Sequence, residues 1–243
     1  MLDYHIVLDL EMNPVGDADA ATGLKTETIE IGAVKISAAT NQIIDEFTCL
    51  VRPEYNHRIE PNITRLTGIT TGEVRSAGGF ASALTGFSDW VGRERVRIYS
   101  WSPSDHLQLR SECKAKHIAF PDNLRNWIDF QAEYPKYWGR SNSRALSLKD
   151  AARLIGTDVA PDCAHRALYD AQITAKLVMF ALSGACKRDI GTTYHGTGPM
   201  TYTIGDACGN KLAALLARFM NTEEREADRD ETESIGTAGA FVR

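Results

Sequence analysis

Three apolar segments near the start of the chain constrain its fold most strongly. They cover residues 5–11, 27–37 and 42–52, are rich in Ile, Val and Leu, and are separated by turn-prone Gly, Asn, Asp and Thr. Runs of this kind predict β-strands, and their close succession predicts a three-stranded antiparallel meander. Both alternating faces of the second segment are apolar, so we expect it to be a central strand that is buried on both sides.

Later segments predict a helix and a further strand. Thr70 and Glu73 form a capping-box pattern, and apolar residues recur at helical spacing from Val74 to Val91, which predicts one helix. Residues 95–101 then have the apolar content of another strand.

Two capping signals and one apolar stripe predict three more helices. Ser104 is expected to cap a helix that begins after the strand. Ser147 and Asp150 form the capping pattern of a helix over residues 146–155, and an apolar stripe from Ala164 to Leu182 predicts the last helix of the domain. Strands followed by interspersed helices predict an α/β fold in which helices cover the sheet.

Four acidic residues depart from these patterns, and three of them adjoin apolar runs, where an unpaired charge is unfavourable. Asp9 and Glu11 lie in the first strand segment, Asp105 at an expected helix start and Asp170 in the last helix. Residues two apart on a strand point to the same side, roughly 6.6 Å apart, so Asp9 and Glu11 can both reach one metal-sized space. Taken singly, each acid has an ordinary alternative: an exposed strand end, a helix N-cap or a solvated helix residue.

His165 precedes Asp170 by five residues. That spacing corresponds to about 140° around an α-helix, too far for two side chains to share a face. We therefore expect His165 to lie in the loop or first turn before the helix that carries Asp170. The alternative is a surface histidine.

Together these residues resemble the DEDDh branch of the DnaQ-like 3′→5′ exonucleases, whose fold is RNase H-like. The shared features are an Asp-x-Glu after an apolar strand, an Asp in a following segment and a final His-x-x-x-x-Asp, and the match spans residues 5–183. Supporting segments follow in the family's order: Ile29–Val34, Leu66–Ile69 and Trp127–Asp129. The resemblance implies a mixed β-sheet that begins with the antiparallel meander and is flanked by helices.

The resemblance also implies a chemistry. Asp9, Glu11 and Asp170 would hold two Mg²⁺ or Mn²⁺ ions, Asp105 would complete the second site through water, and His165 would deprotonate the attacking water. Oxygen ligands suit hard cations, two ions about 3.5–4 Å apart assist phosphodiester hydrolysis, and histidine suits a general base at neutral pH. The expected reaction releases nucleoside 5′-monophosphates from the 3′ ends of single-stranded RNA or DNA.

Two departures from the family pattern bear on the substrate. Met12-Asn13-Pro14 replaces the Thr-Thr-Gly that often follows the first Glu, and Trp101 stands where many relatives have Asn. A tryptophan at this position is similar to the pattern of the KapD-like and histone-mRNA-degrading exoribonucleases, which favours RNA as the substrate. Met12 and Leu66 are similar to family positions that wedge against the terminal base, and both fit an apolar core equally well.

A basic segment supplies the other predicted substrate contacts. Residues 136–149 contain four basic residues, two aromatic residues and no acid. Basic groups among aromatic rings suit a single strand whose phosphates are tracked and whose bases are stacked. The alternative is a solvated loop whose aromatic side chains lie in the core. The contacts predicted in this segment are Lys136, Trp138, Arg140 and Arg144.

Negative charge is concentrated at the C-terminal end. The net charge is −5, of which residues 222–243 contribute −4 through seven acids and three arginines. We expect residues 1–186 to form the exonuclease domain, residues 187–221 a Gly-rich connection with an amphipathic helix, and residues 222–243 an acidic, disordered tail. The amphipathic helix, over residues 206–220, is a candidate contact for a second copy or a partner protein.

Composition bears on location. No apolar run approaches the roughly 20 residues of a membrane helix, and five scattered cysteines without a CxxC pair favour a reducing compartment. We therefore expect a soluble, cytoplasmic protein that does not engage a membrane. Cys186, His195 and Cys208 offer a partial set of zinc ligands but lack a fourth at finger-like spacing, so inert thiols are the preferred interpretation.

Two other functions fit the same residues. One is a DNA-directed 3′→5′ exonuclease or a proofreading subunit, which would need a separate polymerase because 243 residues leave no room for one. The other is a non-catalytic nucleic-acid-binding module of the same fold. The presence of all four carboxylates and the histidine favours an enzyme.

Overall fold

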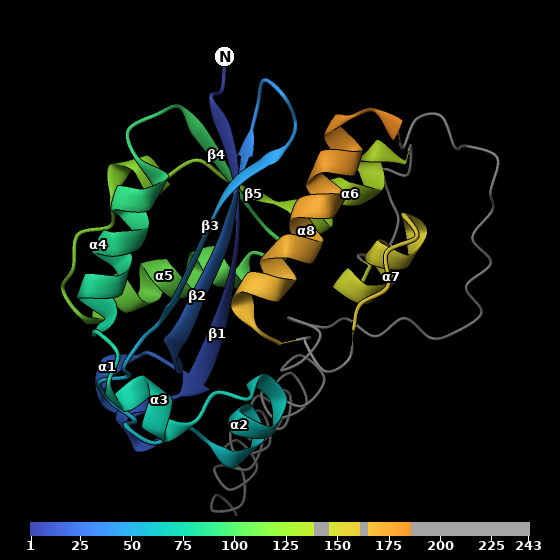
Figure 1. Cartoon of the computed structure of the whole chain (residues 1–243). Helices are drawn as coiled ribbons and strands as arrows, with labels where there is room; N and C mark the ends of the chain where they lie inside the picture. The colour runs from blue at the N-terminus through green and yellow to red at the C-terminus, as the bar shows by residue number, and fades with distance from the viewer. Residues whose placement is uncertain (139–145, 161–164, 186–243) are drawn as a thin grey trace, which may run out of the picture.

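A computed structural model describes residues 1–138, 146–160 and 165–185 (Figure 1). Its centre is a five-stranded sheet in the order β3-β2-β1-β4-β5. The strands are β1 (Tyr4–Pro14), β2 (Thr26–Ser37), β3 (Ile43–Leu50), β4 (Val96–Ser100) and β5 (Trp127–Asp129). The predicted α/β architecture, a mixed sheet flanked by helices, is confirmed.

The first three strands form the antiparallel meander that the sequence predicts. β2 pairs with β1 on one side and with β3 on the other. It therefore lies inside the sheet as expected, although β1 holds the middle position of the strand order. β4 runs parallel to β1, and β5 runs parallel to β4. Parallel neighbours need crossover connections, which the helices between these strands supply.

Helices cover both faces of the sheet (Figure 1). One face carries α4 (Phe80–Val91) and α5 (Ser104–Ala115). The other face carries α8 (Ala167–Leu182), with α6 (Phe130–Tyr137) and α7 (Leu148–Leu154) packed beside it. α8 begins at the lower end of the sheet in Figure 1 and runs upward along it.

Shorter elements join these layers. α2 (Pro61–Thr67) and α3 (Thr71–Arg75) lie at the lower end of the molecule in Figure 1. The remaining short elements are the 3₁₀ turn η1 (Gly16–Ala18), α1 (Asp19–Thr22) and the 3₁₀ turn η2 (Asp122–Leu124).

Alternate residues of β1 divide the core between the two faces. Ile6 and Leu8 are fully buried against the α4 and α5 side, whereas Val7 is buried against the α8 side. Because successive strand residues point to opposite faces, Asp9 and Glu11 continue the row of Val7. The acidic residues of β1 therefore extend the apolar row that α8 covers.

The helix predicted from Val74 to Val91 is wrong in one respect, because the structure divides it into α3 and α4. Gly79 has an extended backbone (φ −74°, ψ 171°) and precedes α4. The N–H of Arg52 donates to the carbonyl oxygen of Gly78 at 2.8 Å. This pairing with the chain that follows β3 competes with helical hydrogen bonds, and glycine weakens a helix at such a point.

Helix caps follow the sequence at two of the predicted starts. Thr70 and Glu73 form a complete capping box at α3, and Ser147 caps α7 by accepting a backbone N–H from its first turn. The prediction for Ser104 is wrong, because α5 begins at Ser104 itself and Pro103 occupies the N-cap position.

Within the described residues, no helix has both the length and the apolar character needed to cross a membrane. Cys49 and Cys113 are free thiols, and burial raises the pKa of each to about 11. Both thiols therefore stay protonated near neutral pH, in keeping with inert cysteines. The predictions for residues 187–243, which include the helix over residues 206–220 and the zinc alternative, lie outside the described residues.

Candidate active site

Three carboxylates meet where β1 passes the start of α8. Asp9 and Glu11 come from β1, and Asp170 comes from the first turn of α8. One oxygen atom from each lies within 4.8 Å of the other two. Glu11 is buried, and the other two residues are half-buried. The structure thus brings together three residues that the sequence predicts as metal ligands, in an arrangement that suits a hard divalent cation.

Asp105 lies beside this group, in the first turn of α5. It is 4% exposed, and its Oδ1 accepts the backbone N–H of Leu10 at 3.1 Å. Leu10 stands between Asp9 and Glu11, so the hydrogen bond ties Asp105 to the strand that carries two of the carboxylates. In the described part of the chain the three-oxygen group does not include Asp105. Its water-mediated role stays a prediction.

His165 lies in the loop directly before α8, as its spacing from Asp170 predicts. Its backbone is left-handed (φ 77°), a region that histidine adopts more readily than most residues. The backbone N–H of His165 donates to Oδ2 of Asp170 at 3.2 Å, and Nδ1 lies 4.0 Å from the same oxygen. The imidazole is therefore held beside one carboxylate of the group, with 23% of the side chain exposed.

Gly32 on β2 allows α8 to approach the sheet closely. It pairs with Asp9 in the register of β1 and β2. A Cβ atom at this position would lie 2.0 Å from the backbone nitrogen of Leu168 and 2.2 Å from the carbonyl carbon of Ala167. The first turn of α8 therefore rests on bare backbone, which lets Asp170 reach β1. The sequence signal was a glycine inside a strand, which often marks such an approach.

Glu30 and Arg166 form an ion pair next to the carboxylates. The sequence analysis did not predict this pair. Glu30 pairs with Glu11 in the sheet register and is buried. Nε of Arg166 lies 3.1 Å from each carboxylate oxygen of Glu30, and Nη2 lies 2.5 Å from Oε1. A buried carboxylate needs such partners. The available signal was a glutamate inside an apolar strand segment.

Burial raises the pKa values of three carboxyl groups at the site, those of Asp9, Glu11 and Asp105. It is the main cause for Asp9 and Glu11, whose pKa values lie well above their usual range. The charge of Asp105 adds most to the pKa of Asp9, and that of Asp170 adds most to the pKa of Glu11. Burial also raises the pKa of Asp105 to about 7. Protons and a divalent cation therefore compete for the same oxygens.

Asp9→Asn is expected to stabilise the metal-free protein at about pH 8. Because these pKa values are raised, the folded protein binds more protons than the unfolded chain above about pH 4, and its stability falls as pH rises through that range. The amide removes one of the repelling charges, and each kcal/mol recovered raises Tm by roughly 2–4 °C. Thermal unfolding at about pH 5 and pH 8 measures the effect.

The same melts, repeated with millimolar Mg²⁺, supply the comparison. Wild-type protein should gain stability from Mg²⁺, and gain more at the higher pH, because the cation then displaces fewer protons. Asp9→Asn should gain much less. A wild-type Tm that ignores Mg²⁺ at both pH values would argue against a metal site at these carboxylates.

Three predicted substrate contacts lie in different environments. Leu66 is half-buried on α2, which contacts β1. Met12 packs with Leu10 on the face of the sheet opposite the carboxylates, because both residues share the same strand parity. Trp101 is 6% exposed and packs in the core against Phe130. Core packing accounts for the ring of Trp101, although its buried Nε1 has no hydrogen-bond partner among the described residues. The substrate roles of all three stay predictions.

The described start of the basic segment, Lys136 to Trp138, lies away from the carboxylates. Trp138 stacks on Phe180 with ring centroids 5.8 Å apart, and Phe180 is ten residues, or roughly 15 Å of helix, from Asp170. Lys136 lies in the last turn of α6, and Trp138 is the C-cap residue of that helix. Tyr137 and Trp138 are partly buried and pack against the core, as the alternative interpretation expects. The substrate roles of Lys136 and Trp138 stay predictions. Arg140 and Arg144 lie outside the described residues.

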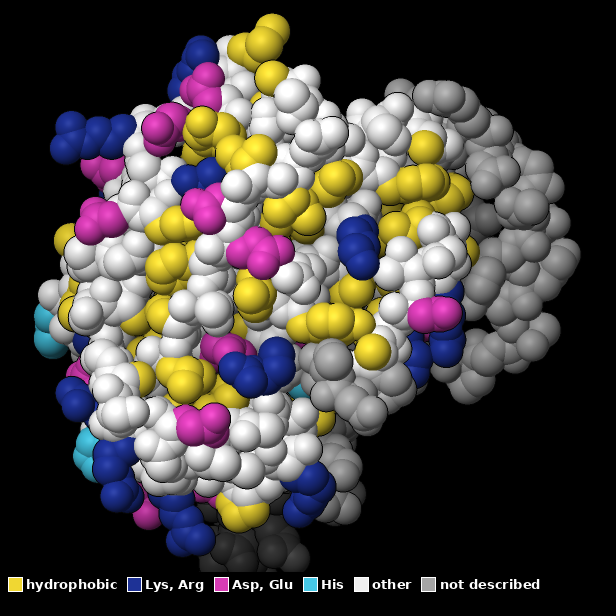
Figure 2. Space-filling model, in the orientation of Figure 1, with side chains coloured by type: hydrophobic (Ala, Val, Ile, Leu, Met, Phe, Trp, Pro, Cys, Tyr) yellow, Lys and Arg dark blue, Asp and Glu magenta, His cyan; other side chains and the backbone are white. Residues whose placement is uncertain are grey.

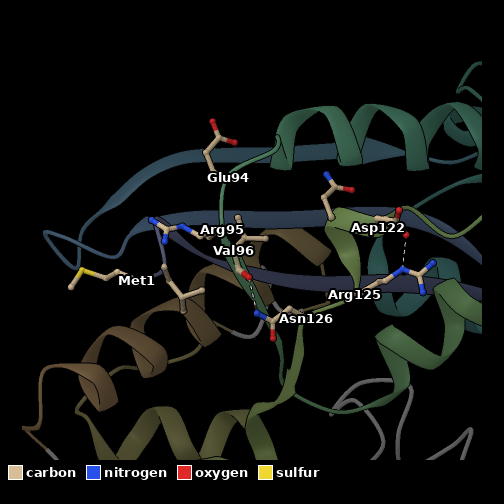
Figure 3. A pocket seen from close by; sticks show the side chains of 9 residues that line it. Met1, Glu94, Arg95, Val96, Asp122, Arg125 and Asn126 are labelled. Carbon is tan, nitrogen blue, oxygen red and sulfur yellow. Dashed lines mark hydrogen bonds and ion pairs between the residues drawn. The ribbon is translucent and has the colours of Figure 1, made fainter.

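A shallow hollow of about 540 Å³ lies at the other end of the sheet, where β1 and β4 begin (Figure 3). Met1, Asp122 and Arg125 are among the residues that line it. β1 starts at Tyr4, five residues and therefore roughly 17 Å before Asp9. The hollow is thus separate from the carboxylates.

Comparisons with known proteins agree with this geometry. The Exonuclease family model (RNase_T) matches residues 6–178. ERI1 exoribonuclease 2 of Danio rerio is 29% identical over 185 residues, which cover 68% of this chain and 33% of that protein. The probable 3′-5′ exonuclease KapD of Bacillus subtilis (strain 168) is 25% identical over 175 residues, which cover 71% of this chain and 81% of that protein.

A solved structure agrees with both the fold and the family. The nuclease domain of 3′hExo, described as a DEDDh family member bound to rAMP, superposes with a TM-score of 0.64 and 25% identity over 76% of this chain and 94% of that chain. The chain spans about a third of the length of the Danio rerio relative. The predicted resemblance is confirmed: the chain belongs to the Exonuclease family, within the DnaQ-like 3′→5′ exonuclease superfamily.

Proposed function

We propose that this protein is a metal-dependent 3′→5′ exonuclease that shortens single-stranded RNA to nucleoside 5′-monophosphates. The observation that carries the proposal is the convergence of Asp9, Glu11 and Asp170 within 4.8 Å, with His165 held against Asp170. Like charges in such a group repel one another. A bound divalent cation offsets this repulsion, whereas a module that only binds the phosphates of a nucleic acid would gain nothing from converging negative charges.

The carboxylates would hold two Mg²⁺ or Mn²⁺ ions. Asp9, Glu11 and Asp170 would be direct ligands, and Asp105 would act through water. When bound, such ions lower the pKa of a water molecule and neutralise charge on the phosphate and the leaving oxygen. An all-oxygen ligand set favours Mg²⁺ or Mn²⁺ over zinc.

His165 would take the proton from the attacking water. Its backbone hydrogen bond to Asp170 ties the loop that carries the base to the first turn of α8, which carries a metal ligand. Neutral imidazole accepts a proton at physiological pH, and proton transfer to a positioned base contributes typically about 10²–10⁴-fold to a rate.

Exposed arginines near the site suit a nucleic-acid strand. Arg58, Arg65 and Arg75 are exposed on or beside α2 and α3, and Lys and Arg side chains gather at this lower end of the molecule in Figure 2. Clustered basic side chains attract the phosphate groups of a nucleic acid. RNA is the preferred substrate because the Danio rerio relative is named an exoribonuclease and the superposed nuclease domain binds rAMP.

We further propose a cytoplasmic location, where free thiols such as Cys49 and Cys113 stay reduced. Residues 206–220 are proposed as the contact for a second copy or a partner protein. Size-exclusion chromatography of the full chain and of a variant with Leu212 and Leu216 replaced by Asp tests that contact, because the variant should elute later only if these leucines join two chains.

Matched oligonucleotides test the polarity and the sugar preference. A 5′-labelled single-stranded RNA should give a ladder of products shortened stepwise from the 3′ end, and DNA of the same sequence should be shortened more slowly. Immediate release of a labelled mononucleotide would contradict 3′→5′ polarity. Faster shortening of DNA would favour the DNA-directed alternative, and tight binding without cleavage would favour the non-catalytic module.

Gly32→Ala is expected to lower both stability and activity. The added methyl group must displace backbone atoms of α8, and overpacking of this kind costs roughly 1–3 kcal/mol. Because α8 carries Asp170, we expect the cleavage rate to fall roughly 10²-fold, as for a group misplaced by about 1 Å. Thermal unfolding and initial rates on labelled RNA measure the two effects.

Gly86→Ala is the matched control. A Cβ atom at Gly86 meets nothing within 4 Å, and alanine is favoured over glycine within a helix such as α4 by about 1 kcal/mol. We expect this variant to be at least as stable as wild type and equally active. Equal activity in the two variants would contradict the role given to Gly32.

A further inference from the structure

An ion pair holds the segment that carries His165. Glu30 lies on β2 and is 1% exposed. Nε of Arg166 lies 3.1 Å from each of its oxygens, and Oε2 also accepts the backbone N–H of Ala167 at 2.9 Å. Arg166 and Ala167 directly follow His165 in the chain. β2 therefore anchors the backbone on one side of His165, while Asp170 accepts the N–H of His165 itself.

The pair also controls charge next to the proposed metal ligands. Glu30 is the register partner of Glu11, so an unpaired Glu30 would add a further acid to the carboxylate group. The guanidinium of Arg166 contacts both oxygens of Glu30 as a planar fork, a geometry that lysine cannot reproduce. Glu30 is thus bound by the Arg166 guanidinium and the backbone N–H of Ala167. The three converging carboxylates of Asp9, Glu11 and Asp170 remain available to bind the cation.

We propose that Arg166 is a positioning residue that acts through His165. The inference rests on the proposed function, in which His165 takes a proton from water. His165 has a left-handed backbone (φ 77°), and the hydrogen bonds on both sides of it help to hold that conformation. The fork between Arg166 and Glu30 restrains the peptide that follows His165 and so holds the imidazole in place. Loosening the fork should slow the proton-transfer step and leave RNA binding intact.

Two other roles for Arg166 predict different kinetics. Its side chain is 47% exposed, so it can also reach a phosphate of the substrate, and that role predicts a higher KM. A purely stabilising role predicts a lower Tm and a rate loss that does not depend on His165. The positioning role differs from both of these, because it predicts a loss of kcat that occurs only when His165 is present.

A double-mutant cycle separates these roles. Arg166→Lys keeps the positive charge beside Glu30 and removes the fork. In the wild-type background we expect kcat to fall roughly 10–100-fold, as for a displaced catalytic group, with KM changed by less than about twofold. In the His165→Ala background the same substitution should change kcat by less than about threefold, because the group it positions is absent.

Arg153→Lys is the control, since Arg153 makes an exposed ion pair with Asp150 on α7, and it should leave kcat and KM unchanged. If Arg166→Lys fails to fold, Glu30→Gln takes its place in the cycle with the same expectation, because the amide oxygen still accepts the N–H of Ala167.

An equal loss of kcat in both backgrounds, or a raised KM with kcat intact, would overturn the inference and leave the proposed function standing. Absence of 3′→5′ cleavage by the wild-type protein, or a normal rate for His165→Ala, would reject the proposed function and the inference with it.

Discussion

Asp170→Asn should abolish cleavage, lowering the rate by roughly 10³-fold or more. The substitution keeps the shape of the side chain and removes its charge from a group whose oxygens lie within 4.8 Å of one another. Removing even one preorganised electrostatic group costs about 10²–10³-fold in rate, and a metal ligand should cost more. The amide oxygen can still accept the N–H of His165, so the loss would report the missing charge rather than a moved loop. Initial rates on 5′-labelled RNA over a range of Mg²⁺ concentrations measure it.

Asp89→Asn provides the control for the charge change. Asp89 is exposed on α4, on the opposite face of the sheet, and its substitution should leave the rate within about twofold of wild type. If Asp170→Asn also stayed within about tenfold of wild type at low Mg²⁺, Asp170 would not be a metal ligand.

His165→Ala should lower kcat by roughly 10²–10⁴-fold, the usual contribution of a positioned general base. Metal and substrate affinity should stay nearly unchanged, because the imidazole lies beside Asp170 at 4.0 Å and its removal takes away none of the converging oxygens. The wild-type rate should rise with pH across the range in which histidine side chains lose a proton, and that rise should be lost in the variant. Single-turnover cleavage from about pH 5.5 to pH 9 at saturating Mg²⁺ measures both effects.

Two variants separate the side chain from the backbone. His117 is also left-handed (φ 55°) and exposed, so His117→Ala tests the cost of alanine in that conformation away from the site and should leave kcat unchanged. His165→Asn tolerates the left-handed backbone better than alanine and should be as impaired as His165→Ala. Recovery of the His165→Ala rate by extra Mg²⁺ would indicate a metal ligand, and a rate within about threefold of wild type would remove His165 from the mechanism.

Local periodicity explains what the sequence could predict. The two-residue period of a strand placed Asp9 and Glu11 on one side of β1, and the 3.6-residue period of a helix placed His165 in the loop before Asp170. The antiparallel meander followed from three apolar runs in close succession. Each of these inferences concerns residues near one another in the chain, where geometry is fixed by the backbone alone.

Local sequence patterns could not predict the contacts between segments that are distant in the chain. The approach of Gly32 to α8 and the pairing of Glu30 with Arg166 depend on the register of β1 and β2 and on where α8 crosses them. A repeating apolar pattern encodes neither quantity. The resemblance supplied Asp105 and Asp170 as partners of β1, because the spacing of these residues in the chain carries no information on their distance in space.

Composition was a weaker guide than position. The basic and aromatic segment after residue 136 matched the chemistry of single-strand binding, yet Trp138 packs on Phe180 at the end of α8 away from the carboxylates. The break between α3 and α4 was missed for a related reason. Apolar spacing continued through Gly78 and Gly79, while the backbone pairing of Gly78 with Arg52 ended the helix.

Cleavage of a 5′-labelled single-stranded RNA in Mg²⁺ and in EDTA tests the central claim most directly. The carboxylate group formed by Asp9, Glu11 and Asp170 predicts a ladder of 3′-shortened products and free nucleoside 5′-monophosphates in Mg²⁺, no cleavage in EDTA, and recovery when Mg²⁺ is restored. Asp9→Ala should show no ladder under any of these conditions. Cleavage that continues in EDTA, or that survives in Asp9→Ala, would contradict a metal-dependent exonuclease centre at these residues.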